Sequence, residues 1–384
     1  MQEKYEMNKR ICFIGYDLNS MFPTGVQRYT LEILNAMDRL VSPGEVELLI
    51  TRDEDDCSFH NIRTVNLYDE KVKSSRIAQK LHSNGLAGRR LTTRLKNDRF
   101  LYKNWFLKEY VKKNDAIYVD LLQHFPNIGC DVIAIHDCIP EINMKEKLKR
   151  DQKHRKRRVE NAIGKAKKIV TVSSTSRKEI LKYYPTDKEI TVIPNSWQHF
   201  ERIKENNSII ERLHLQGKDF FFSVGSVFPH KNFRWISCAA RENPDCIFVV
   251  SGRITSEVDI SQDALLKNII FTDYISDGEI KCLMRNCKAF IQPSLAEGFG
   301  IPPLEAMSVG ADCILSNCSA FQEVYGQSVW YIDPLEYDDI SMKDIMSKHK
   351  EGNDLILNKY SWNISAEKML DVIRSLQDCT CMET

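Results

Sequence analysis

The sequence predicts an α/β protein made of two doubly wound domains that face each other across a cleft. The chain has 384 residues, which suits two domains of ordinary size. Short apolar runs alternate with helical patterns along its whole length, and helix-start signals follow several of these runs. A strand, a capped helix and a further strand form the repeating unit of a parallel sheet, so we predict one such sheet in each half.

Apolar runs of four or five residues predict the first sheet. Both faces of a parallel sheet are covered by helices, so its strands are apolar throughout instead of alternating with polar residues. We assign this sheet to a first domain, residues 1–202. The strands predicted for it span residues 11–15, 46–50, 132–135, 169–172 and 190–193.

A second series of apolar runs follows a polar interval at residues 201–212, which we interpret as the linker. We assign this series to a second domain, residues 203–358. The strands predicted for it span residues 220–224, 246–250, 269–271, 289–292, 313–315 and 329–332.

Two capping boxes predict helix starts. In a capping box, a Ser side chain and a Glu three residues later satisfy free backbone N–H groups. Ser176 with Glu179 and Ser276 with Glu279 have this spacing, and each pair follows a predicted strand. Ligands of doubly wound folds bind beyond the carboxyl ends of strands, so functional residues are expected in the segments after each strand.

Composition and charge exclude several classes of protein. Hydrophobic residues make up 42% and charged residues 28%, which is typical of a globular chain and excludes disorder. The 54 Lys and Arg residues balance 53 Asp and Glu residues, so no overall field attracts nucleic acid or membrane. The twelve cysteines are scattered without a C-x-x-C pair, and no uncharged apolar run approaches the roughly 18 residues of a membrane span. We therefore expect a cytoplasmic protein with reduced thiols.

The segment after the strand at residues 289–292 has the strongest functional signal. Glu297 and Glu305 are separated by seven residues, with Gly298 and Gly300 between them and two prolines beside a predicted helix start. Glycines allow close approach of the backbone to a ligand, and the free N–H groups of a helix N-terminus bind anions. This pattern predicts a diphosphate site with two carboxylates that reach different parts of one ligand.

The stretch from Glu297 to Glu305 resembles the signature of retaining glycosyltransferases of family 4. These enzymes have the two-domain GT-B fold, with Rossmann-like domains, and transfer a sugar from a nucleotide diphosphate donor. The resemblance implies that residues 359–384 form a helix that crosses back to the first domain. Further segments that resemble the family span residues 24–28, 135–140, 170–177, 192–196, 224–232, 251–253, 273–277 and 360–362.

The resemblance also implies roles for individual residues. Glu297 and His136 are the expected catalytic residues, both in contact with the transferred sugar. Lys231 is expected to bind the donor phosphates and Glu305 the ribose hydroxyls. Ser226 stands where many members of the family have Arg. The resemblance implies no metal or other cofactor. The residues expected to bind the donor are Gly25, Ser226, Lys231, Tyr274, Gly298, Phe299, Gly300, Ile301 and Glu305.

A concentrated basic segment at residues 145–158 contains nine Lys or Arg residues. It is interpreted either as a solvated helix face or as a surface that contacts anionic lipid, which attracts such clusters. No nucleic-acid-binding motif accompanies it, so no nucleic-acid partner is expected. The residues assigned to this patch are Lys153, Arg155, Lys156, Arg157 and Arg158.

Asp53-Glu-Asp55 spells the D-x-D pattern with which other glycosyltransferases hold a metal and a nucleotide sugar. The pattern stands in an acidic run after an early predicted strand, without other features of that class. We interpret it as a solvated loop.

These observations predict a retaining enzyme that transfers a hexose, with mannose mildly preferred, from a nucleotide sugar to a lipid-linked surface polysaccharide. Its expected location is the cytoplasm, in peripheral contact with the inner face of the membrane. Two alternatives stay open: a nucleotide-sugar epimerase of the same fold, and a non-catalytic protein that binds nucleotide or nucleic acid.

Overall fold

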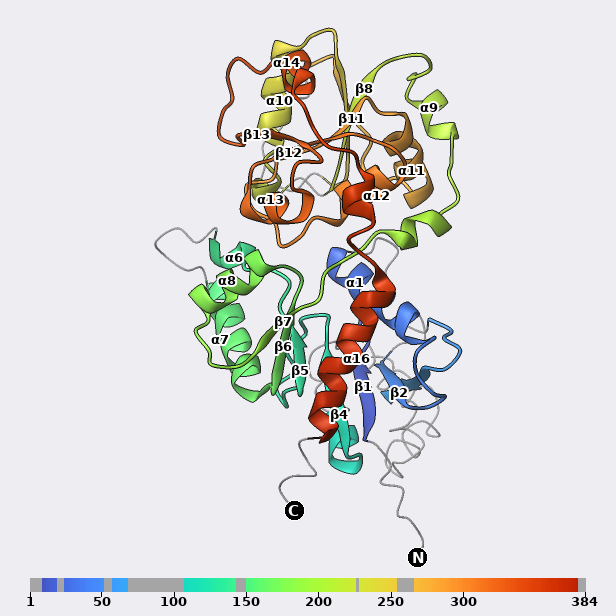
Figure 1. Cartoon of the computed structure of the whole chain (residues 1–384), viewed down its shortest axis with the longest axis vertical. Helices are drawn as coiled ribbons and strands as arrows, with labels where there is room; N and C mark the ends of the chain where they lie inside the picture. Colours follow the sequence, from blue (N-terminus) through green and yellow to red (C-terminus); the bar gives the residue numbers. More distant parts are fainter. Residues whose placement is uncertain are drawn as a thin grey trace, which may run out of the picture.

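The computed structural model describes residues 9–18, 24–51, 57–67, 107–142, 150–225, 228–253 and 266–378. These residues form two parallel sheets, one in each half of the chain, and Figure 1 shows them as two stacked domains. The predicted fold class is confirmed.

The first sheet has the strand order β3-β2-β1-β4-β5-β6-β7, and every pairing in it is parallel. Two of its strands, β3 and β4, are missing from the sequence prediction. The edge strand β3 has a mostly polar sequence, so no apolar run marks it, whereas β4 does contain an apolar run that the prediction passed over. The strands are β1 (Arg10–Ile14), β2 (Val46–Ile50), β3 (Arg63–Asn66), β4 (Ala116–Asp120), β5 (Val132–Ala134), β6 (Lys168–Thr171) and β7 (Ile190–Val192).

The second sheet has the order β10-β9-β8-β11-β12-β13 and is also parallel. All six predicted strands are present. The direction of strand addition reverses between β1 and β4 in the first sheet and between β8 and β11 in the second, and such points are where doubly wound folds bind ligands. The strands are β8 (Phe220–Val224), β9 (Ile247–Ser251), β10 (Ile269–Phe271), β11 (Ala289–Gln292), β12 (Cys313–Ser316) and β13 (Trp330–Ile332).

The helices begin where capping allows them to. The capping box of Ser276 with Glu279 is confirmed at α11. The box predicted at Ser176 is wrong, because α8 begins at Ser174 and Ser173 is its N-cap. The helices are α1 (Gly25–Met37), α6 (Ile139–Ile142), α7 (Arg150–Lys165), α8 (Ser174–Tyr183), η2 (Gln198–Arg202), α9 (Ser208–Arg212), η3 (Pro229–Lys231), α10 (Phe233–Glu242), α11 (Asp277–Asn286), α12 (Ile301–Ser308), α13 (Ser319–Tyr325), α14 (Met342–Ser347), α15 (Asp354–Leu357) and α16 (Trp362–Asp378).

The chain crosses from the first sheet to the second in the segment that contains η2, the outgoing crossing, and returns in the segment before α16, the return crossing. The two crossings are hydrogen-bonded to each other. Gln198 in the outgoing crossing donates to the carbonyl of Tyr360 at 2.9 Å and accepts from the Trp362 N–H at 3.3 Å. Beyond Trp362, α16 runs back along the first domain beside α1 (Figure 1). The exact domain limits at residues 202 and 358 stay a prediction.

Candidate active site

Glu297 lies in the loop between β11 and α12, at the point where the order of the second sheet reverses. The residue is buried, with 9% of its surface exposed. Its Oε1 accepts hydrogen bonds from Lys231 Nζ at 2.6 Å, Gln292 Nε2 at 2.7 Å and Ser294 Oγ at 2.7 Å. Burial on its own raises the pKa of a carboxyl group, but the charge of Lys231 and these three hydrogen bonds outweigh it. The pKa of Glu297 lies below its usual value, so the carboxylate is ionised at neutral pH.

Lys231 is brought to Glu297 by the turn that follows β8. Asn232 ends this turn in the left-handed region, with φ 55°, and its buried amide donates to the carbonyls of Pro293 and Pro334 at 3.1 and 2.7 Å. These bonds tie the β8 loop to the segments that follow β11 and β13. A Lys ammonium has three donors, so Lys231 can bind an anion while it stays paired with Glu297. The sequence analysis identified Lys231 but not the Asn232 that positions it.

The start of α12 is built for close approach of the backbone. Gly300 has φ 85°, and a Cβ there would lie 2.4 Å from the Phe321 ring, so the position requires glycine. Pro302 and Pro303 have no N–H groups, so the donors that this helix end can offer to an anion stop at Ile301.

The Phe299 side chain is buried and packs edge-on against Tyr360, with 5.2 Å between ring centroids. Only the backbone of Phe299 is therefore left for a ligand. The Ile301 side chain lies across from Gly25 of the first domain, where a Cβ on Gly25 would be 3.9 Å from Ile301 Cδ1.

Gly298 is where the β11 loop meets the first domain. A Cβ on Gly298 would lie 2.5 Å from the carbonyl oxygen of His136, so the two backbones are in direct contact. The Gly298 carbonyl accepts hydrogen bonds from Ser173 Oγ at 2.6 Å and Ser176 Oγ at 3.2 Å, at the start of α8. Ser176 Oγ also lies 2.9 Å from the His136 carbonyl. The predicted catalytic segments of both domains are thus adjacent.

A carboxylate from the second domain binds the same helix end. Glu323 of α13 accepts from the backbone N–H groups of Ser174 and Thr175 and from the Thr175 hydroxyl, each at 2.7 Å. Burial raises the pKa of Glu323, but the hydrogen bonds lower it by more than burial raises it. The pKa of Glu323 therefore lies below its usual value. The N–H groups of Ser174 and Thr175, at the start of α8, are therefore occupied by the opposite domain.

His136 follows β5 and is buried, with its ring edge-on to Tyr29. Burial lowers its pKa to about 4, although the carbonyl of Leu121 and the charge of Asp120 act in the opposite direction. The ring is therefore neutral at pH 7. Its Nε2 lies 2.9 Å from the Leu121 carbonyl, which can only accept, so Nε2 carries the proton and Nδ1 is an acceptor.

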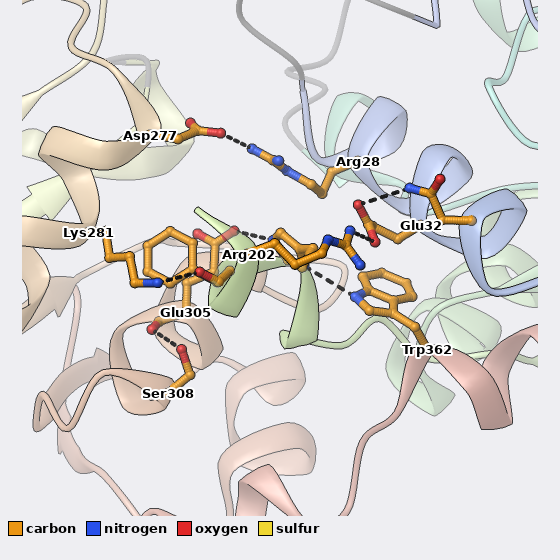
Figure 2. Close-up of polar contacts among 11 residues, drawn as sticks. Arg28, Glu32, Arg202, Asp277, Lys281, Glu305, Ser308 and Trp362 are labelled. Atoms are coloured by element: carbon orange, nitrogen blue, oxygen red, sulfur yellow. Dashed lines mark hydrogen bonds and ion pairs between the residues drawn. The ribbon is translucent and has the colours of Figure 1, made fainter. Parts of the chain in front are cut away.

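Glu305 lies on α12. Its carboxylate is hydrogen-bonded to a ring nitrogen of His199, and the other ring nitrogen of His199 contacts the indole of Trp362. Its Oε1 is 2.7 Å from Nε2 of the buried His199, whose Nδ1 lies 3.1 Å from Trp362 Nε1. Figure 2 shows Glu305 and Trp362 on opposite sides of the η2 segment. The sequence analysis missed His199; the signal available was a polar and aromatic Trp-Gln-His run just before the predicted linker.

Two further ion pairs lie near these residues, one between the two domains and one between η2 and the first domain. Arg28 of α1 pairs with Asp277 of α11 at 2.8 Å, and Arg202 of η2 pairs with Glu32 of α1 at 2.6 Å (Figure 2).

Tyr274, expected at the donor base, follows β10 and is 47% exposed. Ser226 and the Asp53-Glu-Asp55 pattern lie outside the described residues.

The basic patch lies on α7 and divides into two kinds of residue. Arg155 pairs with Glu141, and Arg158 donates to the carbonyl of His124, so both guanidinium groups are turned toward the protein. Lys156 lies 3.8 Å from Glu160. Lys153 and Arg157 are exposed. Only part of the predicted patch is therefore directed to solvent.

Within the residues that the structure describes, no group of three or more His, Cys, Asp or Glu side chains is arranged to hold a metal ion. No helix among them is long and apolar enough to cross a membrane.

Comparisons with known proteins agree with this geometry. The family model described as glycosyl transferases group 1 matches residues 205–362. The chain is 27% identical over 352 residues to the O-antigen chain mannosyltransferase B of Escherichia coli, covering 84% of this chain and 87% of that protein. It is 31% identical over 180 residues to the O-antigen chain mannosyltransferase RfbU of Salmonella typhimurium, covering 45% of this chain and 48% of that protein.

The fold is similar to that of sucrose-phosphate synthase from Thermosynechococcus elongatus, with a TM-score of 0.66 and 14% identity over 97% of this chain and 100% of that chain. The chain is a GT-B glycosyltransferase. The resemblance noted in the sequence is confirmed, and the comparisons favour sugar transfer over the epimerase alternative. In this glycosyltransferase the group 1 match contains β8 to β13 and both carboxylates, Glu297 and Glu305.

Proposed function

We propose that this glycosyltransferase transfers a hexose, with mannose preferred, from a nucleoside diphosphate donor to a growing lipid-linked surface polysaccharide. The observation that carries the proposal is the ion pair of the buried Glu297 with Lys231 at the reversal point of the second sheet. The two curated relatives named above, both O-antigen chain mannosyltransferases, support the choice of sugar and acceptor class.

The chemistry assigns a role to each charge. Breaking the bond between a sugar and a diphosphate develops positive charge on the sugar and negative charge on the leaving diphosphate. Lys231 and the N–H groups from Gly298 to Ile301 are fixed donors that stabilise the diphosphate, which is the kind of preorganised electrostatics that lowers barriers. Glu297 faces the sugar as an anion. His136 accepts a hydrogen bond from a sugar hydroxyl at Nδ1. We infer that these groups replace a resident metal.

Transfer of a radiolabelled hexose to a lipid-linked acceptor tests the function. We expect turnover with GDP-mannose above that with UDP- or dTDP-linked sugars, and the same turnover after treatment with a chelator. Hydrolysis or isomerisation of the donor without an acceptor product would contradict the proposal. Loss of activity on chelation would contradict the absence of a metal.

Lys231→Met is expected to weaken binding of nucleoside diphosphate by about tenfold or more, because a hydrogen bond to a charged group is worth about 1.5–3 kcal/mol. It should also move the acid limb of the pH–activity profile to higher pH. The reason is that Glu297 stays buried while the cation that lowers its pKa is removed. Calorimetry and a pH profile measure the two effects. Lys288→Met, which removes an exposed pair with Asp219, is the matched control; equal effects in both variants would contradict the assignment.

We also propose that the exposed basic residues of α7 contact anionic lipid. Each is worth roughly 1 kcal/mol near such a surface, so reversal of both Lys153 and Arg157 to Glu should lower partitioning onto vesicles that contain phosphatidylglycerol by at least about 30-fold. Lys343→Glu with Lys348→Glu, both exposed near α14 in the other domain (Figure 1), makes the same change in net charge. An equal loss in that control would show that net charge, and not this helix, is responsible.

A further inference from the structure

We propose that His199 is a positioning residue for the Glu305 carboxylate, and that Trp362 favours the tautomer in which His199 does this. The inference rests on the proposed function and on the ribose-binding role that the resemblance to the family implies for Glu305. It adds two residues that position Glu305: His199 in the first crossing and Trp362 at the end of the second.

The direction of each hydrogen bond follows from the donor inventory. An indole N–H can only donate, so the 3.1 Å contact between Trp362 Nε1 and His199 Nδ1 requires a lone pair on Nδ1. The proton of the neutral ring is then on Nε2, which lies 2.7 Å from Glu305 Oε1. The indole at Nδ1 and the carboxylate at Nε2 therefore favour the same tautomer, the one in which His199 donates to Glu305.

Because the site is buried, the hydrogen bond from His199 decides how the Glu305 carboxylate is oriented. His199 is 2% exposed, its ring lies 5.9 Å from that of Trp362, and the Glu305 side chain is 11% exposed. A buried carboxylate with one oxygen held by a donor presents its other oxygen in a defined direction. Two adjacent ribose hydroxyls need such a fixed pair of acceptor oxygens. Without the imidazole donor, the carboxylate loses the bond that sets its rotation.

The three residues come from three separate parts of the chain. His199 is on η2 in the outgoing crossing, Trp362 begins α16 after the return crossing, and Glu305 belongs to the second domain. The side chain of Gln198, next to His199, donates to the Tyr360 carbonyl and accepts from the backbone N–H of Trp362. These two bonds hold the two crossings together. Figure 2 shows Glu305 and Trp362 below the Arg28–Asp277 pair. The donor-site carboxylate is therefore oriented by the segments that connect the domains.

Two substitutions of one residue separate the two hydrogen bonds. His199→Gln carries an amide that reaches the Nε2 position, where its N–H can still donate to Glu305. His199→Asn reaches only the Nδ1 position, where its oxygen can still accept from Trp362. Both variants lose the same ring, so the loss of ring packing is common to the two, and they differ in one methylene and in the hydrogen bond that the amide keeps.

The readout is the preference for ribose over 2′-deoxyribose in the nucleoside diphosphate, GDP or UDP, that the wild-type protein binds more tightly. We expect His199→Asn to weaken binding of the ribonucleotide by about tenfold and to reduce this preference, with His199→Gln within about threefold of wild type. Binding of inorganic pyrophosphate, which has no ribose, should be unchanged in both. Trp362→Phe should reduce the preference in the same direction but by less, because the His199 ring loses the donor that holds it at Nδ1 while its contact with Glu305 remains.

Glu305→Ala separates failure of this inference from failure of the proposed function. If Glu305→Ala leaves the ribose preference intact, the ribose-binding role of Glu305 is wrong. If it removes the preference while His199→Asn does not, the positioning role of His199 is wrong. Equal losses in His199→Asn and His199→Gln would likewise overturn it, since they would reflect packing alone.

Discussion

Glu297→Gln is expected to lower kcat for sugar transfer by at least about 10²-fold, the size of effect seen when one preorganised electrostatic group is removed. Glutamine keeps the shape of the side chain and an oxygen that can accept from Ser294 and Lys231. It removes the negative charge that faces the sugar as positive charge develops there. The substitution therefore tests charge separately from packing.

The same variant should bind nucleoside diphosphate at least as tightly as wild type. Lys231 loses its anionic partner and, with a side chain that is 27% exposed, becomes available to the phosphates. Steady-state kinetics measures the expected fall in kcat, and calorimetry measures the affinity for nucleoside diphosphate. Thermal unfolding checks that the fold is intact. Glu336→Gln, at an exposed position, is the control. Turnover near that of wild type would remove Glu297 from the catalytic role.

Gly298→Ala is expected to separate the two halves of the site. Its Cβ would lie 2.5 Å from the His136 carbonyl and 3.1 Å from Asp137 Cβ, and a backbone atom cannot move aside cheaply. Overpacking of this kind costs about 1–3 kcal/mol, so the population with the domains in contact should fall by about 5-fold to 150-fold. Transfer should fall by a similar factor, because His136 and Glu297 come from opposite domains.

Nucleoside diphosphate binding should be nearly unchanged in Gly298→Ala, because Lys231 and Glu305 both belong to the second domain. Gly164→Ala is the matched control, since a Cβ there meets nothing within 4 Å. Small-angle scattering measures the separation of the domains directly. A compact variant with full activity would show that the contact at Gly298 has no part in turnover.

The second domain and its donor loop could be predicted from sequence because their signals are local. Each strand from β8 to β13 is a run of adjacent apolar residues, and Glu297, the glycines and Glu305 lie within nine residues. Signals of this kind depend on backbone preference and burial over a short window. The edge strand β3 lacks such a run, and its place in the sheet is decided by pairing with β2.

The roles of some predicted residues changed once their neighbours were known. Phe299 was expected at the donor, but its side chain packs on Tyr360 in the core. Arg155 and Arg158 belong to the basic run in sequence, yet each is bound by the protein itself. A helix face can be assigned from spacing, whereas the partner of a long side chain depends on which other element packs there.

By itself, the sequence determined the α/β class, the two parallel sheets, and the loop that carries Glu297, Gly298, Gly300 and Glu305. Only the tertiary structure decided that Gly298 touches His136, that Lys231 pairs with Glu297, and that Trp362 holds His199 against Glu305. The members of these contacts are far apart in the sequence: 66 residues for Lys231 and Glu297, 106 for His199 and Glu305, and 163 for His199 and Trp362. The contact of Gly298 with His136 joins the two domains. Local chemistry chooses an element, but a contact between distant residues exists only when both sheets and both crossings have packed.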